Sequence, residues 1–105
     1  MKVKIPKEIK IGAFSYSIKM VEGLENDYHL LGQCLTDKGI IKLEMHSIPQ
    51  VKDATLLHEV VHAINDVFVC KIDDECVERI AQGLAEILKN NLGIEFDWSE
   101  IKNGG

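Results

Sequence analysis

Residues 55–64 read TLLHEVVHAI, and this stretch decides how the second half of the chain folds. Its apolar residues recur every three or four positions, which is the period of a helix with a buried side. A rotation of about 100° per residue gathers the polar residues of residues 55–66 into one narrow stripe. That stripe holds Thr55, His58, Glu59, His62, Asn65 and Asp66. The pattern predicts a helix that is buried over most of its circumference and turns one polar edge to a cleft.

Two histidines of this stripe stand four residues apart, and a glutamate directly follows the first. His58 and His62 project from one face about one turn apart, so both imidazoles can bind one Zn²⁺ at roughly 2.0–2.1 Å. Glu59 lies about 100° further round the helix, where its carboxylate can take a proton from a water molecule at the metal. The H-E-x-x-H spacing therefore predicts a zinc site with Glu59 as the catalytic base, most often that of a peptidase.

A catalytic zinc ion takes three protein ligands and keeps one position for water, so a third side chain must come from elsewhere. The following segment predicts a second amphipathic helix that carries Glu75, Glu78 and Glu86. Its buried side is predicted to be formed by Val77, Ile80, Ala81, Leu84 and Leu88. Glu78 lies at the edge of that side, whereas Glu75 and Glu86 point to solvent. Glu78 is therefore the predicted third ligand.

Four more side chains are candidates for supporting roles. Asn65 and Asp66 share the polar stripe and are candidates to hold a ligand imidazole in place. His46 and Tyr28 are candidates to stabilise an oxyanion as a second electrophile. Residues 39–45 would bind an extended peptide by strand addition if they form the edge strand beside the cleft. Their alternation of Ile and Lys suits a solvent-facing hairpin equally well, so the sequence leaves both readings open.

The first 46 residues predict a small antiparallel sheet of three or four strands. The expected strands are residues 7–11, 15–21, 28–35 and 39–45, in which apolar residues alternate with polar ones. The sequence TDKG at residues 36–39 is a hairpin turn with its glycine placed for a positive φ. We expect this sheet to form one side of the domain.

Residues 47–105 are predicted to be mainly helical. The sequence SIPQ at residues 47–50 matches a capping box with proline in the first turn, so the first helix is expected from about residue 48 to 69. Asp73 or Asp74 can cap the second helix, which is expected to end near Asn91. A short connection makes the two helices antiparallel neighbours, and residues 94–98 are expected to pack on the core. The sequence thus predicts one α+β domain, with the sheet packed on two helices.

Composition narrows the possible partners. The chain has 105 residues, 46% of them hydrophobic, and a net charge of −5, which argues against a general nucleic-acid surface. It contains no apolar run near the roughly 20 residues that span a membrane. The N-terminus lacks the apolar core of a secretory signal, so we expect a cytoplasmic protein. Its three cysteines form an odd set without a usual zinc-binding spacing and are expected to be mainly small buried hydrophobic residues.

Residues 55–64, together with VERIAQGL at residues 77–84, resemble the small HExxH proteins encoded by phages and other mobile elements. These are similar to minimal gluzincin-type zinc peptidases and, more distantly, to the ImmA/IrrE and SprT-like groups. The resemblance covers most of the chain, including its N-terminal hairpins. It implies zinc bound by His58, His62 and Glu78, Glu59 as the catalytic base, and a peptide or protein substrate.

One alternative belongs to another class of protein. Zinc would then clamp the two helices together in a regulatory or protein-interaction module without peptidase activity. Structural zinc sites are usually closed by four protein ligands, and only three are evident here. Glu59 would also have no structural reason to be a carboxylate, so the enzyme is favoured. Because so short a chain has little room for pocket walls, we expect that a protein partner completes the site.

Overall fold

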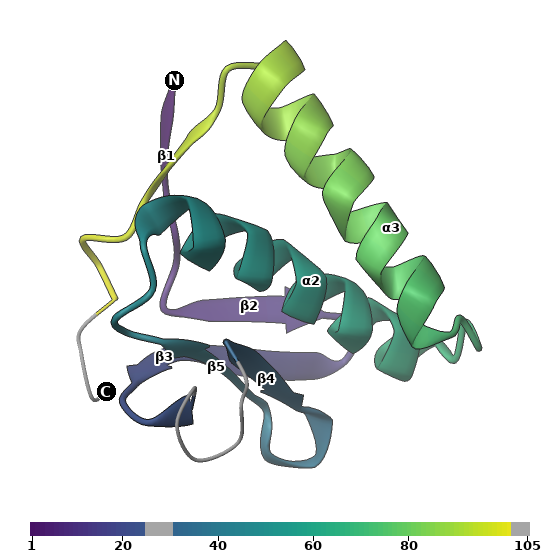
Figure 1. Ribbon diagram of the computed structural model, residues 1–105. Helices are drawn as coiled ribbons and strands as arrows, with labels where there is room; N and C mark the ends of the chain where they lie inside the picture. The colour runs from purple at the N-terminus through teal and green to yellow at the C-terminus, as the bar shows by residue number, and fades with distance from the viewer. Residues whose placement is uncertain (25–30, 102–105) are drawn as a thin grey trace.

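A four-stranded sheet, helix α2 (Pro49–Phe68) and helix α3 (Asp74–Glu86) lie in three successive layers (Figure 1). This arrangement is seen in a computed structural model, which describes residues 1–24 and 31–101. Helix α2 forms the middle layer, because it contacts the sheet on one side and α3 on the other. Among the described residues, no helix is long and apolar enough to cross a membrane. The predicted α+β class is confirmed.

The sheet contains β2 (Glu8–Ile11), β3 (Phe14–Val21), β4 (Gly32–Leu35) and β5 (Ile40–Glu44). The order of the strands is β2-β3-β5-β4, so β4 and β2 are the edges. The pairs β2–β3 and β4–β5 are antiparallel, as predicted. The central pair β3–β5 is parallel, so the sheet is mixed and the prediction of a purely antiparallel sheet is wrong at this pair.

The strands β3 and β5 are parallel because β5, and not β4, is the strand of the β4–β5 hairpin that packs beside β3. The predicted turn is confirmed, because Gly39 has a φ of 63° and reverses the chain between β4 and β5. Ile41 and Leu43 of β5 are fully buried, so this more apolar strand takes the central position. The alternation of side chains fixes which face of a strand is buried but says nothing about which neighbour it pairs with.

Helix α2 starts and ends with recognisable backbone signals. Pro49 occupies its first turn after Ile48 at the N-cap, which suits a residue with fixed φ and no N–H. Ser47 does not cap the helix, and its buried hydroxyl has no hydrogen-bond partner among the described residues, so the predicted capping box is wrong. Val69 ends the helix in the left-handed region with a φ of 51°.

Helix α3 begins as predicted but is rotated about its axis relative to expectation. Asp73 caps it, because its carboxylate accepts a hydrogen bond of 2.8 Å from the backbone N–H of Cys76. Val77 and Ala81 are buried against α2, whereas Ile80 and Leu84, predicted to be buried, are exposed. Because Val77 and Ala81 have small side chains, α3 can approach α2 closely. In this orientation Glu78 faces α2 and contacts His58. A wider helical turn, η2 (Ile87–Asn91), continues α3.

The two ends of the chain meet beside the helices. The predicted C-terminal segment forms β6 (Glu95–Asp97), which pairs in parallel with the N-terminal strand β1 (Lys2–Lys4). Next to it, the indole N–H of Trp98 donates a hydrogen bond of 2.7 Å to Asp53 of α2. Asp53 also forms an ion pair with Lys89 of η2. These contacts fasten the C-terminal segment to the N-terminal half of α2.

Candidate metal centre

His58 and His62 lie side by side on α2 with their Nε2 atoms turned toward each other. The two Nε2 atoms are 3.1 Å apart, and the rings meet edge to face with centroids 4.7 Å apart. Two nitrogens bound to one zinc ion at roughly 2.0–2.1 Å in tetrahedral geometry lie about 3.3 Å apart. The spacing of the two imidazoles therefore fits a pair of zinc ligands.

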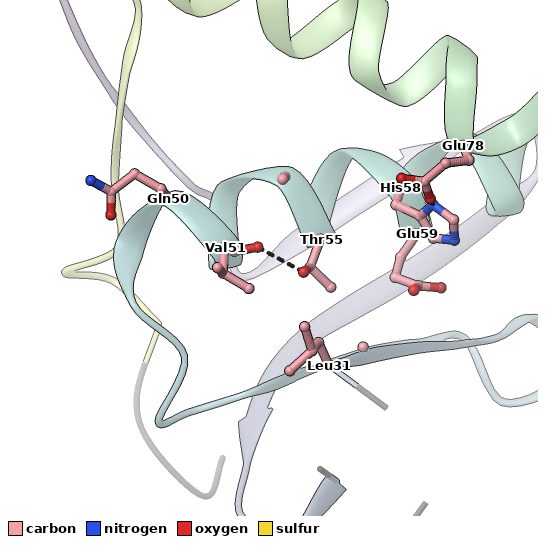
Figure 2. Close-up of a pocket in the computed structure, with 9 residues that line it drawn as sticks. Leu31, Gln50, Val51, Thr55, His58, Glu59 and Glu78 are labelled. Carbon is pink, nitrogen blue, oxygen red and sulfur yellow. Dashed lines mark hydrogen bonds and ion pairs between the residues drawn. The ribbon is translucent and has the colours of Figure 1, made fainter. Parts of the chain in front are cut away.

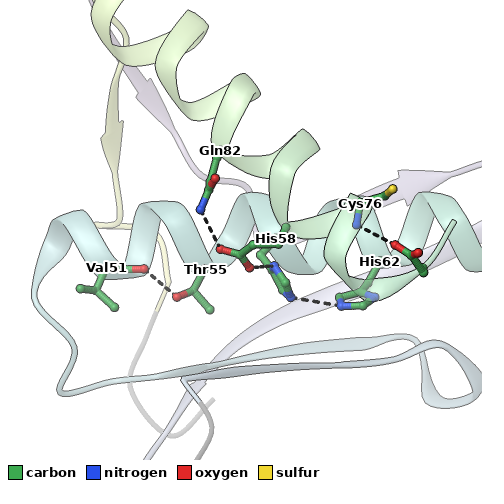
Figure 3. A network of polar contacts seen from close by, with 8 residues as sticks. Val51, Thr55, His58, His62, Cys76 and Gln82 are labelled. Carbon is green, nitrogen blue, oxygen red and sulfur yellow. Dashed lines mark hydrogen bonds and ion pairs between the residues drawn. The ribbon is translucent and has the colours of Figure 1, made fainter.

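Helix α3 brings Glu78 to the opposite nitrogen of His58. Its Oε2 atom lies 2.9 Å from His58 Nδ1, an ion-pair distance, although this buried nitrogen makes no well-aligned hydrogen bond. Gln82, one turn along α3, donates a hydrogen bond of 3.2 Å to Glu78 Oε1 (Figure 3). A carboxylate at the second nitrogen of a metal-binding histidine fixes the orientation and tautomer of that ring. Glu78 is therefore in contact with the histidine pair, on the side away from His62.

The fit of zinc to these residues is partial. Within residues 1–24 and 31–101, no three His, Cys, Asp or Glu side chains are arranged to hold a metal together. The two imidazoles supply two donors at a suitable spacing, whereas the Glu78 carboxylate lies at Nδ1 of His58 and not beside the two Nε2 atoms. The role of Glu78 as third ligand stays a prediction, while its contact with His58 is observed.

Glu59 is buried beside the two histidines. Its side chain points from α2 toward β4 (Figure 2), and only 7% of the residue is exposed. Burial raises the pKa of this carboxyl, and the nearby His58 lowers it by a smaller amount. Among the described residues, none donates a hydrogen bond to its carboxylate. A buried carboxylate of raised pKa and without such a donor is suited to accept and release a proton.

The site opens to solvent through two cavities between α2 and β4. The larger has a volume of about 530 Å³ and is lined by Leu31, Gly32, Gln50, Val51, Ala54, Thr55, His58, Glu59 and Glu78 (Figure 2). The smaller, of about 280 Å³, is lined by Gly32, Gln33, Cys34, His58, Glu59, His62 and Asp66. Gly32, His58 and Glu59 line both. Space for a ligand therefore exists directly on either side of Glu59.

Strand β4, rather than the predicted strand, forms the wall of this site. Residues 39–45 were expected as a possible edge strand for substrate, but β5 is paired on both sides, so that expectation is wrong. The edge beside the cavities is β4, whose Gly32 packs against Thr55 and Glu59. The hairpin is confirmed from residue 32 onward, residues 28–30 of its first predicted strand lie outside the described residues, and the order of its two strands in the sheet was not predicted.

Of the three supporting candidates that the structure describes, only Asp66 lines one of the two cavities. It lines the smaller one and accepts a hydrogen bond of 2.7 Å from the Thr36 hydroxyl. The Asn65 amide instead forms two hydrogen bonds, of 2.9 and 3.1 Å, with the backbone of Ile72, so it holds the connection between α2 and α3. That geometry gives Asn65 a structural role in place of the predicted imidazole contact.

The two predicted electrophiles have different outcomes. The His46 imidazole is exposed and lies 3.4 Å from a Glu22 carboxylate oxygen, so its observed contact is away from the histidine pair. Tyr28 lies outside the described residues. The structure therefore offers no second electrophile from the predicted set within the part of the chain that it describes.

Several residues near the site were not identified from sequence. The buried Tyr16 hydroxyl donates a hydrogen bond of 3.2 Å to Thr36 Oγ1, which in turn donates to Asp66. Cys34 lines the smaller cavity, and burial raises the pKa of its thiol. These residues come from β3, β4 and the hairpin turn, so only the tertiary fold places them at α2. No local sequence signal marks them.

Comparisons with protein-family models, with curated proteins and with solved structures gave no significant match. The function therefore has to be inferred from the residues of the site and their geometry.

Proposed function

We propose that the chain is a zinc-dependent peptidase with His58 and His62 as metal ligands and Glu59 as the general base. The observation that carries this proposal is the pair of Nε2 atoms 3.1 Å apart beside a buried carboxylate in the same cavity. Glu78 is proposed as the third ligand, because it is the acidic residue that α3 brings to His58. The H-E-x-x-H spacing on one helix supports the same assignment.

Each residue of the chain has a distinct task in this scheme. Zinc bound by the two histidines would lower the pKa of a water molecule and polarise the scissile carbonyl. Glu59 accepts a proton from the attacking water and returns it to the leaving amine. Burial favours this role, because a carboxyl whose pKa is raised is a stronger base toward water than an exposed one. Glu78, whose Oε2 lies 2.9 Å from His58 Nδ1, would orient this imidazole once a hydrogen bond forms between them.

The position of β4 indicates how a peptide would bind. As the edge strand beside both cavities, β4 can pair with an extended segment through its backbone groups. A peptide aligned in this way would pass Gly32 and lie across Glu59 and His58. An unfolded protein or a flexible segment is therefore the proposed substrate, and a partner protein that covers the open side of the cavities is proposed to complete the site.

We also propose that the chain is related to gluzincin-type peptidases and lies in the cytoplasm, as expected from the sequence. The HExxH helix, followed by a helix that carries a glutamate, is the order found in gluzincin-type peptidases, and the likeness to small phage-encoded HExxH proteins supports the same class. A cytoplasmic location is proposed because all three cysteines are free, as is usual in a reducing compartment.

The alternative is a zinc-binding interaction module without catalysis. It is favoured by one observation, which is that Glu78 contacts His58 at Nδ1 and no third donor is in place among the described residues. The two proposals differ in what Glu59 does. In the module, Glu59 has no task, and a burial that raises its pKa would be a cost without a benefit.

Cleavage of unfolded protein by the zinc-loaded chain tests the proposal. A library of denatured proteins is incubated with native chain, with chelator-treated chain and with chelator-treated chain to which zinc is returned, and new termini are identified by mass spectrometry. We expect new termini with native and zinc-restored chain and none after chelation. Stable zinc binding without new termini for any substrate would instead support the interaction module.

A further inference from the structure

The side of α3 that faces away from the metal centre carries an uncovered apolar stripe. Ile80 and Leu84 of α3 and Ile87, the first residue of η2, recur at helical spacing and are 42%, 37% and 52% exposed. On helical geometry this stripe lies nearly opposite Glu78, which contacts His58. Apolar residues placed side by side on a helix surface are a common mark of a protein-interaction site.

A glycine lies within this stripe without a role in the single chain. Gly83 is inside α3, where glycine costs roughly 0.5–1 kcal/mol relative to alanine. Apart from the adjoining residues and the backbone of α3 itself, no atom of the described residues lies within 4 Å of the position that a Cβ at residue 83 would occupy, so nothing in this part of the chain requires a glycine there. A glycine there allows the backbone of a second helix to approach closely.

The charges beside the stripe indicate what covers it. Arg79 is the only basic residue of α3, and Glu86 lies on the same flank of the stripe about two turns away. In a two-fold symmetric contact, residue i of one copy meets residue j of the other, and the reverse holds as well. If the two helices are antiparallel and the two-fold axis passes between Gln82 and Gly83, Arg79 of each copy lies opposite Glu86 of the other, which gives two ion pairs. In a parallel pairing, the flank that carries Arg79 and Glu86 would lie on opposite sides of the contact in the two copies, so no Arg79–Glu86 pair could form across it.

We propose that α3 pairs antiparallel with α3 of a second copy of this chain, through Ile80, Leu84 and Ile87, with two Arg79–Glu86 ion pairs across the contact. Arg79 already pairs with Glu75 one turn away, so its side chain lies along the flank where Glu86 of the second copy would lie. The contact leaves both cavities open, because they lie between α2 and β4. The proposal is independent of the proposed peptidase activity.

Molar mass measured by sedimentation equilibrium over a concentration series tests the pairing. We expect the native chain to pass from monomer to dimer as its concentration rises, and Ile80→Glu to remain monomeric with unchanged helix content. Ile48→Glu is the matched control, because Ile48 is 60% exposed and lies away from α3, and it should dimerise like the native chain. A native chain that stays monomeric, or an Ile80→Glu chain that dimerises normally, would overturn the proposal.

Charge exchange tests the antiparallel register. Arg79→Glu and Glu86→Arg should each weaken dimerisation by roughly tenfold, since each turns two attractions into repulsions, and the double variant should restore it. A double variant no tighter than either single one would contradict the register. The native Cys76 gives a second readout, because antiparallel helices keep the two Cys76 residues about 20 Å apart. A Cys76–Cys76 disulfide forming readily in the dimer would indicate parallel helices and overturn the proposal.

Discussion

Asp53 and Glu59 lie on the same helix and are almost equally buried, with 6% and 7% of each residue exposed, yet their surroundings differ. Asp53 accepts a hydrogen bond from the Trp98 indole and pairs with Lys89, whose ammonium also lies 4.7 Å from the centre of the Phe96 ring. Glu59 receives no hydrogen bond from any described residue and borders two cavities. Asp53 fastens the N-terminal half of α2 to the C-terminal segment, whereas Glu59, in the middle of the helix, lies buried at the wall of two cavities that a ligand could enter.

The difference separates a structural carboxylate from one available for chemistry. Burying a charge is unfavourable unless partners replace the lost water, and Asp53 has such partners. Glu59 lacks them, so burial raises its pKa and leaves its oxygens free to exchange a proton. A protein keeps such a group where it has a function more often than where it only supports the fold. The contrast can be tested by changing each of the two carboxylates in turn.

The largest effect is expected from Glu59→Gln. Removing the general base should lower the rate of peptide cleavage by about 10²–10⁴-fold while zinc binding is kept. The metal-free variant should be at least as stable as the native chain, because a neutral amide avoids the cost of burying a charge. Cleavage kinetics and thermal unfolding check the two halves. A fully active Glu59→Gln chain would remove the distinction between the two carboxylates.

Asp53→Ala should have the opposite signature. It leaves Lys89 and the Trp98 indole without their partner, so we expect a loss of about 2–3 kcal/mol in the free energy of unfolding. Zinc affinity should be unchanged, because Asp53 is not among the residues that line the cavities at His58 and Glu59. Urea unfolding followed by circular dichroism gives the stability. Asp53→Asn, which keeps an acceptor for the indole, should lose less, and an equal loss in both variants would show that the Trp98 hydrogen bond contributes little.

Gly32→Ala sharpens the comparison by filling the space beside Glu59. A Cβ at residue 32 would collide with Thr55 Cγ2 and come within 3.2 Å of Glu59 Cγ and Oε2. Forcing β4 away from α2 should cost about 1–3 kcal/mol, with a loss of activity because Glu59 is displaced. Thr55→Ser removes the colliding methyl group and keeps a hydroxyl that can bond to the Val51 carbonyl, as Thr55 does now. The double variant should recover most of the stability, and no recovery would place the strain elsewhere.

The smallest effect is expected at Gly83, where the same change meets no neighbour. Gly83→Ala should stabilise the monomer by about 0.5–1 kcal/mol, because alanine is the better helix former. Thermal unfolding at low protein concentration, with cleavage activity unchanged, checks this. Destabilisation of the monomer by Gly83→Ala would mean that the surface around α3 is less open than the structure indicates.

Local signals in the sequence were sufficient for the elements and for the core of the site. Pro49 and the apolar periodicity located α2, the pair Asp73 and Asp74 located the start of α3, and Gly39 located the hairpin turn. The four-residue spacing of His58 and His62 implied that their imidazoles meet, as they do. Each of these features depends on contacts within one turn of helix or one hairpin, which neighbouring residues determine.

Features that depend on how the helices and strands pack against one another could not be predicted from local sequence patterns. The alternation in β5 predicted its buried face but not its central place in the sheet, so the sequence could not decide whether residues 39–45 form the edge strand, and the structure shows that they do not. The apolar side of α3 was broad, and tertiary packing selected Val77 and Ala81 for burial over Ile80 and Leu84. The partners of Asp53 are distant in sequence, so no local pattern could identify them.

Zinc stoichiometry and affinity, measured on the purified metal-free chain by titration calorimetry and elemental analysis, test the central claim most directly. We predict one zinc ion per native chain, one per Glu59→Gln chain, and loss of tight binding in His58→Ala and in His62→Ala. Glu78→Ala should weaken binding by at least 10–100-fold, the range for a residue that orients a ligand. A native chain that takes up no zinc, or histidine variants that bind it as tightly as the native chain, would contradict the account.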